Sequence, residues 1–154
     1  MDEHALDLGR VVALGHSAGG HLAVWAAGQQ TLDGVRLTGV VSQSGVLNLA
    51  LAEELNLSDG AVANLLGGPS SSVPERYRSA DPMAALPLDV PVVAVHAEND
   101  ADVPLALSAT YVAASEGAAV PARLVTVPGD HYALIDPSAE AYVTCRELVR
   151  ELLT

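Results

Sequence analysis

Residues 10–22 read Arg-Val-Val-Ala-Leu-Gly-His-Ser-Ala-Gly-Gly-His-Leu, an apolar strand pattern that ends in Gly-x-Ser-x-Gly and passes at once into a helical pattern. In this context the motif predicts a tight turn that strains the backbone of Ser17 and lifts its Oγ clear of the sheet. We expect Gly15 and Gly19 to be steric necessities, because a side chain at either position would crowd the neighbouring strand or the helix start. The stretch therefore indicates a serine nucleophile, against the alternative of a Gly/Ser turn without chemistry.

The helix that follows Ser17 presents backbone N–H groups that have no partner within the helix. The same end is the positive end of the helix dipole, so these groups can stabilise negative charge on a substrate oxygen. We expect the N–H of Ala18 to act as a donor of such an oxyanion hole.

Length and composition limit the class of protein. A chain of 154 residues with 50% hydrophobic residues forms one domain with a sizeable core. Apolar runs such as residues 90–95 are much shorter than the roughly 20 residues of a membrane helix, and no signal segment opens the chain, so we expect a cytoplasmic protein without a membrane span. The net charge of −12 disfavours binding to nucleic acid and to anionic membranes.

Cofactor chemistry finds no support in the sequence. Cys145 is the only cysteine, which excludes an internal disulfide and a cysteine-based metal cluster. No set of His, Asp and Glu has the spacing of metal ligands, and no glycine-rich phosphate loop suggests a nucleotide. We expect neither a metal nor another cofactor.

Short apolar runs alternate with longer helical patterns, which indicates a mostly parallel sheet in a three-layer α/β/α sandwich. The predicted strands are residues 11–14, 37–42, 92–95 and 123–127. The predicted helices are residues 18–29, 60–66, 105–116 and 137–153. The first has Leu22, Trp25 and Ala26 on one face. The second has Ser58 or Asp59 as N-cap and ends at Gly67, and the last has Asp136 as N-cap. We expect a single domain over 1–154.

Residues 43–90 form the least regular region, rich in Gly, Ser and Pro. We expect it to be a cap-like insertion over the carboxyl edge of the sheet, where ligands of open α/β sheets bind. The alternative is a solvated connector without a role in binding.

A serine hydroxyl needs a base, and five histidines are candidates. His131 is the strongest, because it follows the last predicted strand and so lies at the same sheet edge as the serine. His96 belongs to the next acidic motif, while His16, which we expect to point away from the nucleophile, and His21 are expected to be structural. His4 lies near the end of the chain.

The imidazole needs a carboxylate at its second nitrogen. The loop after the strand 92–95 offers Glu98, Asp100 and Asp102. We choose Asp100, with Asp102 as the alternative acid and Glu98 behind both. The opposing interpretation is a solvated acidic loop that caps the following helix.

The chain order Ser17, Asp100, His131 is the order of α/β-hydrolases. Three stretches carry a closer resemblance: residues 15–22, His-x3-Asp-x2-Val-Pro over 96–104, and Asp-His-Tyr-x-Leu-Ile-Asp-Pro over 130–137. Together they resemble the esterase and kynurenine formamidase-like branch of that superfamily, including its feruloyl-esterase-like domain. The resemblance implies Ser17 as nucleophile, Asp100 as orienting acid and His131 as general base.

Two departures from that branch stand out. His96-Ala97 replaces the usual His-Gly, a mild change. Members also carry further strands and a His-Gly-Gly loop before the elbow, whereas only about ten residues precede the elbow strand here. The chain thus resembles the carboxyl-terminal half of the fold, and loss of one oxyanion donor costs about 10²–10³ in rate. We expect either a fragmentary gene product or pairing of strand 11–14 with another chain, as a homo-oligomer or with a partner.

Three functions remain open at this point. The first is a serine hydrolase that cleaves a small carboxylic ester or amide through an acyl-enzyme. The second is a catalytically inert remnant or interaction module. The third is a serine peptidase related to prolyl oligopeptidases, against which stand Ala18 after the serine and the missing propeller-type repeats.

Overall fold

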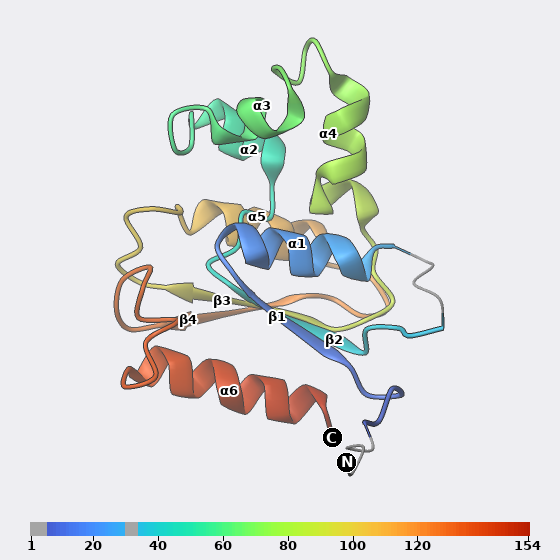
Figure 1. The fold of residues 1–154 in the computed structure, drawn as a ribbon, viewed down its shortest axis with the longest axis vertical. Coiled ribbons are helices and arrows are strands. Elements are labelled where there is room, and N and C mark those ends of the chain that lie inside the picture. Colours follow the sequence, from blue (N-terminus) through green and yellow to red (C-terminus); the bar gives the residue numbers. More distant parts are fainter. Residues whose placement is uncertain (1–5, 30–33) are drawn as a thin grey trace, which may run out of the picture.

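A computed structural model describes residues 6–29 and 34–154 (Figure 1). Four strands form one parallel sheet in the order β1-β2-β3-β4. The strands are β1 (Val12–His16), β2 (Gly39–Gln43), β3 (Val92–Ala97) and β4 (Arg123–Val127). Because all four run parallel, their carboxyl ends lie at one edge of the sheet, and the predicted α/β class is confirmed.

Helices cover both faces of the sheet. The helices α1 (Ala18–Ala27) and α5 (Ala106–Ala114) lie on one face and α6 (Glu140–Leu152) on the other (Figure 1). The central strands β2 and β3 are buried along their whole length, which agrees with their mainly apolar sequence. The buried polar side chains among them are Ser42, Gln43 and His96. This is the predicted three-layer sandwich.

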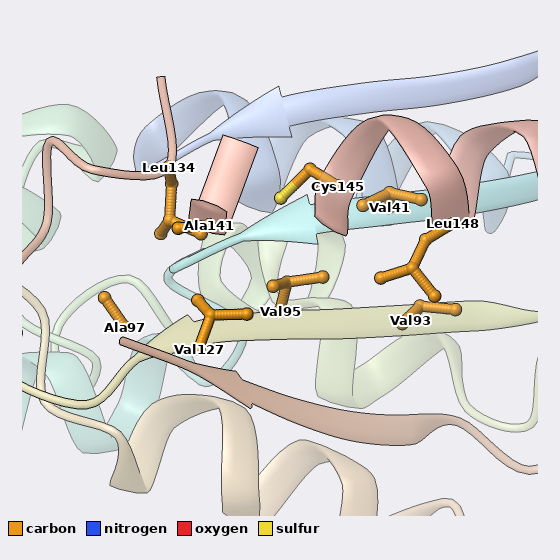
Figure 2. Close-up of a cluster of buried hydrophobic side chains, with 9 residues drawn as sticks. All are labelled: Val41, Val93, Val95, Ala97, Val127, Leu134, Ala141, Cys145 and Leu148. Carbon is orange, nitrogen blue, oxygen red and sulfur yellow. The ribbon is translucent and has the colours of Figure 1, made fainter. Parts of the chain in front are cut away.

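Two apolar cores fill the spaces between these layers. Figure 2 shows the core beneath α6, where Val41, Val93 and Val95 of the sheet meet Cys145 and Leu148 of the helix. The intervening strand residues point to the opposite core, which includes Val24, Val40, Ala94 and Tyr111. The period of two along each strand thus divides its side chains between the cores.

The strand β1 lies at the edge of the sheet, as the sequence predicts. Within residues 6–29 and 34–154 its residues pair only with β2, and Leu14 keeps 45% of its surface exposed. An open edge with an exposed leucine favours pairing with another strand. What pairs there stays a prediction.

The region 43–90 contains more regular structure than its composition indicates. It holds α2 (Leu49–Glu54), α3 (Ala61–Leu66), α4 (Pro74–Ala80) and the 3₁₀ turn η1 (Pro82–Ala85). The three helices lie beyond the layer of α1 and α5 (Figure 1). Their side chains form a third core with Val103 and Leu107, which joins the region to the rest of the fold.

Three details of the predicted helices are wrong. The helix α6 begins at Glu140, because the Asp136 carboxylate accepts from the N–H and hydroxyl of Ser138 and closes a turn instead. Left-handed Gly60, and neither Ser58 nor Asp59, precedes α3, although Gly67 ends it as predicted.

The third error concerns the buried face of α1. Leu22 is 56% exposed, and the helix instead buries Gly20, His21, Ala23 and Val24. The helix approaches the end of β2 closely at Gly20, where a Cβ would lie 2.6 Å from Ser42 Oγ, while Ala23 and Val24 pack in the core on the sheet. Among the described helices, none has the length and apolar character needed to cross a membrane.

Candidate active site

Ser17 occupies the turn between β1 and α1 with φ 56° and ψ −121°, a conformation that side chains rarely adopt. Surrounding hydrogen bonds hold it there. The Ser17 N–H donates to the carbonyl of Gln43 (2.8 Å), and its own carbonyl accepts from Gly20 N–H (2.9 Å) and His21 N–H (3.2 Å). The backbone thus has the strained elbow geometry that the motif predicts.

The glycines of the motif differ in what they permit. A Cβ at Gly15 would lie 2.1 Å from the carbonyl oxygen of Gly19, and one at Gly20 would lie 2.8 Å from the Cα of Gly45. A Cβ at Gly19 would meet nothing within 4 Å. The expectation that Gly19 is a steric necessity is therefore wrong, since the close approaches are at Gly15 and Gly20.

This difference predicts opposite outcomes for two alanine substitutions. Gly15→Ala should lower the free energy of unfolding by about 2–3 kcal/mol, because backbone atoms must move to admit the methyl group. Gly19→Ala should have a free energy of unfolding within about 0.5 kcal/mol of wild type, or higher than wild type, because alanine has a higher helix propensity than glycine. Urea unfolding of both variants measures the difference. Equal losses in the two variants would contradict it.

His131 lies on the loop after β4 and is hydrogen-bonded to Asp100. Its Nδ1 donates to Asp100 Oδ2 at 2.7 Å, and the two side chains are only 5% and 1% exposed. A carboxylate accepts hydrogen bonds, so the proton of a neutral imidazole lies on Nδ1. Nε2 of His131 then keeps its lone pair and can accept a proton.

Asp100 is held as an ion by its neighbours. Its Oδ1 accepts from the N–H groups of Val103 (2.8 Å) and Asp102 (3.0 Å). Burial opposes ionisation, yet the hydrogen bonds from Val103 and His131 outweigh it and lower the pKa of Asp100 below its ordinary value. The stability from this carboxylate is therefore present above the unfolded-state pKa and is lost as pH falls through the lower folded-state pKa.

The other acidic candidates do not orient the histidine. Glu98 and Asp102 are exposed, and within the described residues neither side chain is hydrogen-bonded to His131. A carboxylate oxygen of Asp100, one of Asp102 and a ring nitrogen of His131 do lie within 4.8 Å of one another. The bond between Asp100 and His131 accounts for that proximity, so the cluster does not by itself indicate a metal site.

The remaining described histidines each hold the loops around the site. His21 Nε2 is hydrogen-bonded to the carbonyl of Ala80 (2.8 Å), and buried His96 lies between Ser108 Oγ and the carbonyl of Val103. Burial lowers the pKa of His96. The sequence predicts a structural role for His21 but not for His96, and these bonds join both side chains to neighbouring segments. His4 lies outside the described residues.

His16 differs from its prediction. Its ring does not point away from the site but packs against His131, with ring centroids 4.3 Å apart, and its Nε2 is hydrogen-bonded to the His131 carbonyl (2.9 Å). Periodicity could not reveal this contact, because it depends on where the loop after β4 folds back. The contact brings His131 next to the residue that precedes Ser17.

Ser17, His131 and Asp100 thus gather at one sheet edge. Within the described residues no hydrogen bond joins Ser17 Oγ to His131. Such bonds are often longer in a free enzyme and tighten when substrate binds. Ala18 is the first residue of α1, where a backbone N–H has no partner within the helix.

A cavity of about 150 Å³ opens beside Ser17. Its walls come from the start of α1, from the region of α2 and α3, and from the loop that carries Asp100. The lining residues are Ser17, Ala18, His21, Val46, Leu49, Leu57, Ser58, Ala61, Val62, Leu65 and Val103. None of them is an Asp, Glu, Lys or Arg, so the cavity suits an uncharged, apolar group.

The parallel sheet, the strained serine elbow and the histidine–aspartate pair define the α/β-hydrolase class, which includes serine hydrolases. Comparison with protein families places the chain within that class. It belongs to the prolyl oligopeptidase family, whose model matches residues 1–149. The arguments against this family, Ala18 after the serine and the missing propeller-type repeats, were therefore not decisive.

Solved structures agree on the fold. Esterase B from Lactobacillus rhamnosis has a TM-score of 0.74 at 22% identity, and the match covers 95% of this chain and 53% of that one. The same esterase inhibited by a C4-C4 tributyrin phosphonate gives a TM-score of 0.73 at 22% identity, over 96% and 53% of the two chains. Acylaminoacyl peptidase from Pyrococcus horikoshii gives 0.73 at 20% identity, over 94% and 23%.

The chain thus spans about half the length of the esterase structures that it matches. No sequence among curated proteins matches it. A specific likeness to kynurenine formamidase or feruloyl esterase stays a prediction.

Proposed function

We propose that the chain carries the catalytic residues of a serine hydrolase that cleaves a small carboxylic ester or amide through an acyl-enzyme. The observation that supports this most is the buried bond between His131 and Asp100 beside the strained Ser17. In this proposal Ser17 is the nucleophile, His131 the general base and Asp100 the acid that orients it.

The reaction follows from these positions. Ser17 Oγ attacks the carbonyl carbon while Nε2 of His131 takes its proton, and the Ala18 N–H donates to the oxyanion. His131 then gives the proton to the leaving alcohol or amine as the C–O or C–N bond breaks. Water then attacks the acyl carbon while His131 takes a proton from it. As the bond from the acyl carbon to Ser17 Oγ breaks, His131 returns that proton to Oγ and the carboxylic acid leaves. Asp100 stabilises the imidazolium in both halves.

The cavity beside Ser17 supports an apolar acyl group in the substrate. A cavity of about 150 Å³ lined mostly by aliphatic side chains has room for a molecule the size of benzene. That size corresponds to a short acyl chain, and a tributyrin phosphonate is the inhibitor of the similar esterase B. We therefore propose 4-nitrophenyl butyrate as the first test substrate.

Filling this cavity predicts a change in acyl preference. Ala61→Phe should lower kcat/KM for the butyrate ester about tenfold relative to the acetate ester. The new ring would take the space needed by the two methylene groups that a butyryl group has and an acetyl group lacks. Ala61 lines the cavity, whereas exposed Asn64 on the same helix does not. Asn64→Phe is therefore the matched control and should keep the wild-type ratio. A parallel fall for both esters in Ala61→Phe would argue against an acyl site here.

A second candidate function is cleavage of peptides, which membership of the prolyl oligopeptidase family favours. The proposed mechanism serves both, since only the leaving group differs. Rates on a matched butyryl ester and butyryl anilide separate the two. An anilide rate within about tenfold of the ester rate would favour a peptidase, because chemistry on an activated ester is intrinsically easier.

The alternative is an inert remnant or interaction module that keeps these residues by descent. A fluorophosphonate probe distinguishes it, because covalent labelling needs a reactive serine but no particular acyl or leaving group. A folded protein that the probe does not label would favour the remnant.

A further inference from the structure

The loop that carries His131 has no regular secondary structure. It joins β4 to α6, and the hydrogen bonds within it include those from the N–H groups of Tyr132 and Ala133 to the carboxylate of Asp130, both at 3.0 Å, and that from the Ile135 N–H to the Tyr132 carbonyl (3.1 Å). These bonds shape the turn but do not place it relative to Ser17. The position of His131 therefore needs contacts from outside the loop.

Two side chains from the sheet provide such contacts. His16 Nε2 donates to the carbonyl of His131 at 2.9 Å, and Gln43 Nε2 donates to the carbonyl of Leu134 at 2.5 Å. Gln43 is buried, and its carboxamide faces the loop from the end of β2. Both bonds hold the backbone of the loop and leave the imidazole of His131 free to react.

Both residues are also joined directly to the nucleophile. His16 precedes Ser17 in the chain, and the carbonyl of Gln43 accepts the Ser17 N–H at 2.8 Å. His16 and Gln43 thus each connect the backbone of Ser17 to the backbone of the loop that carries His131. The loop is also held from the β3 side, by the bond of His131 to Asp100 and by the bond from the Asn99 N–H to the Gly129 carbonyl (3.0 Å). Among the hydrogen bonds of the described residues, however, only these two short connections join it to the backbone of Ser17.

The ring of His16 adds a second contact, because it packs on the ring of His131 at an interplanar angle of 49°. A carbonyl can only accept, so Nε2 of His16 carries the proton. Burial lowers the pKa of His16, although the facing carboxylates of Asp100 and Asp102 and the His131 carbonyl raise it. A neutral His16 avoids a positive charge beside the His131 imidazolium.

We propose that His16 and Gln43 are positioning residues that set the place of the His131 imidazole relative to Ser17. The proposal rests on the proposed function, because it assumes that His131 is the base. His16 acts through its bond to the loop and its ring contact, and Gln43 acts through its bond alone.

The test compares His16→Phe, which keeps a ring but loses the donor, with His16→Gln, which keeps a donor but loses the ring. Gln43→Met removes the second donor at similar length. We expect kcat for 4-nitrophenyl butyrate to fall about tenfold or more in His16→Phe and Gln43→Met, with KM within about twofold, because misplacement by about 1 Å costs up to 10²-fold in rate. His16→Gln should recover part of the loss.

Trp25→Phe is the matched control. Trp25 Nε1 donates to the carbonyl of Ser79 at 2.8 Å, so this variant also removes one ring N–H bond to a backbone carbonyl, but outside the site. It should keep the wild-type kcat. If His16→Phe loses no more kcat than Trp25→Phe while both lose thermal stability, His16 is merely structural and the proposal is overturned.

A spectroscopic signal separates this proposal from the proposed function. The Nδ1 proton of His131, bonded to buried Asp100, should give a low-field proton resonance in the wild type. We expect that resonance to broaden or disappear in His16→Phe and to persist in Trp25→Phe, even if the chain has no turnover. If the fluorophosphonate probe does not label the wild-type protein, only the proposed hydrolase function is refuted. If the resonance is unchanged in His16→Phe, the proposal that His16 positions His131 is refuted. If Gln43→Met does not fold, the His16 pair decides.

Discussion

Ser17→Ala is expected to abolish covalent labelling by a fluorophosphonate probe and to lower kcat/KM for 4-nitrophenyl butyrate by about 10⁴-fold or more. The hydroxyl is the atom that attacks, and the Ala18 N–H and the cavity retain only substrate binding and oxyanion stabilisation. Mass spectrometry of the labelled protein and a spectrophotometric assay measure the two effects.

The variant should remain folded. The hydrogen bonds that hold the elbow use the backbone N–H and carbonyl of Ser17 and not its side chain. Unfolding in urea should show a free energy within about 1 kcal/mol of wild type. A loss of activity can then be assigned to chemistry.

Ser58 provides the matched control, because it is the other serine that lines the same cavity and it also has a positive φ (48°). Ser58→Ala should keep labelling and turnover. Labelling that persists in Ser17→Ala and disappears in Ser58→Ala would show that the nucleophile has been assigned to the wrong serine.

Asp100→Asn is expected to lower kcat by about 10³–10⁴-fold with little change in KM. The carboxylate accepts the Nδ1 proton of His131 at 2.7 Å, and an amide can present an N–H there instead. The imidazole would then carry its proton on Nε2, where it cannot take a proton from Ser17. The neutral amide would also not stabilise the imidazolium.

Asp102→Asn is the control, because Asp102 is the alternative acid in the same loop and its exposed side chain is not bonded to His131. It should keep kcat within about threefold of wild type and the free energy of unfolding within about 0.5 kcal/mol, because the substituted group is exposed and makes no bond to the base. A larger loss in Asp102→Asn than in Asp100→Asn would reverse the assignment of the acid.

Local patterns were sufficient for much of the fold. The bounds of β4 agree with the prediction, because Pro121 and Pro128 limit the apolar run on both sides. The predicted strands 11–14 and 92–95 are extended in the structure to His16 and Ala97, since the parallel ladder continues through polar residues when a neighbouring strand is present. Pairing partners are not visible in a local pattern.

The region 43–90 shows where local patterns were insufficient. The helix α2 is only six residues long and follows its N-cap Asn48, whose side chain accepts from the Leu51 N–H. Such a short helix is unstable alone and depends on the core that it shares with Tyr77 and Leu107. That core joins residues far apart in the sequence, so composition alone indicated an irregular segment.

The sequence by itself determined the parallel α/β class, the serine elbow and the identity of the candidate residues Ser17, Asp100 and His131, because these depend on strand period, turn sterics and the order of strand ends. Only the tertiary structure decided which carboxylate is hydrogen-bonded to His131, which glycine of the elbow is closely packed, and that the ring of His16 contacts His131. Each of these depends on which atoms from distant segments come within a few ångströms, and that is determined by the packing of loops at the sheet edge.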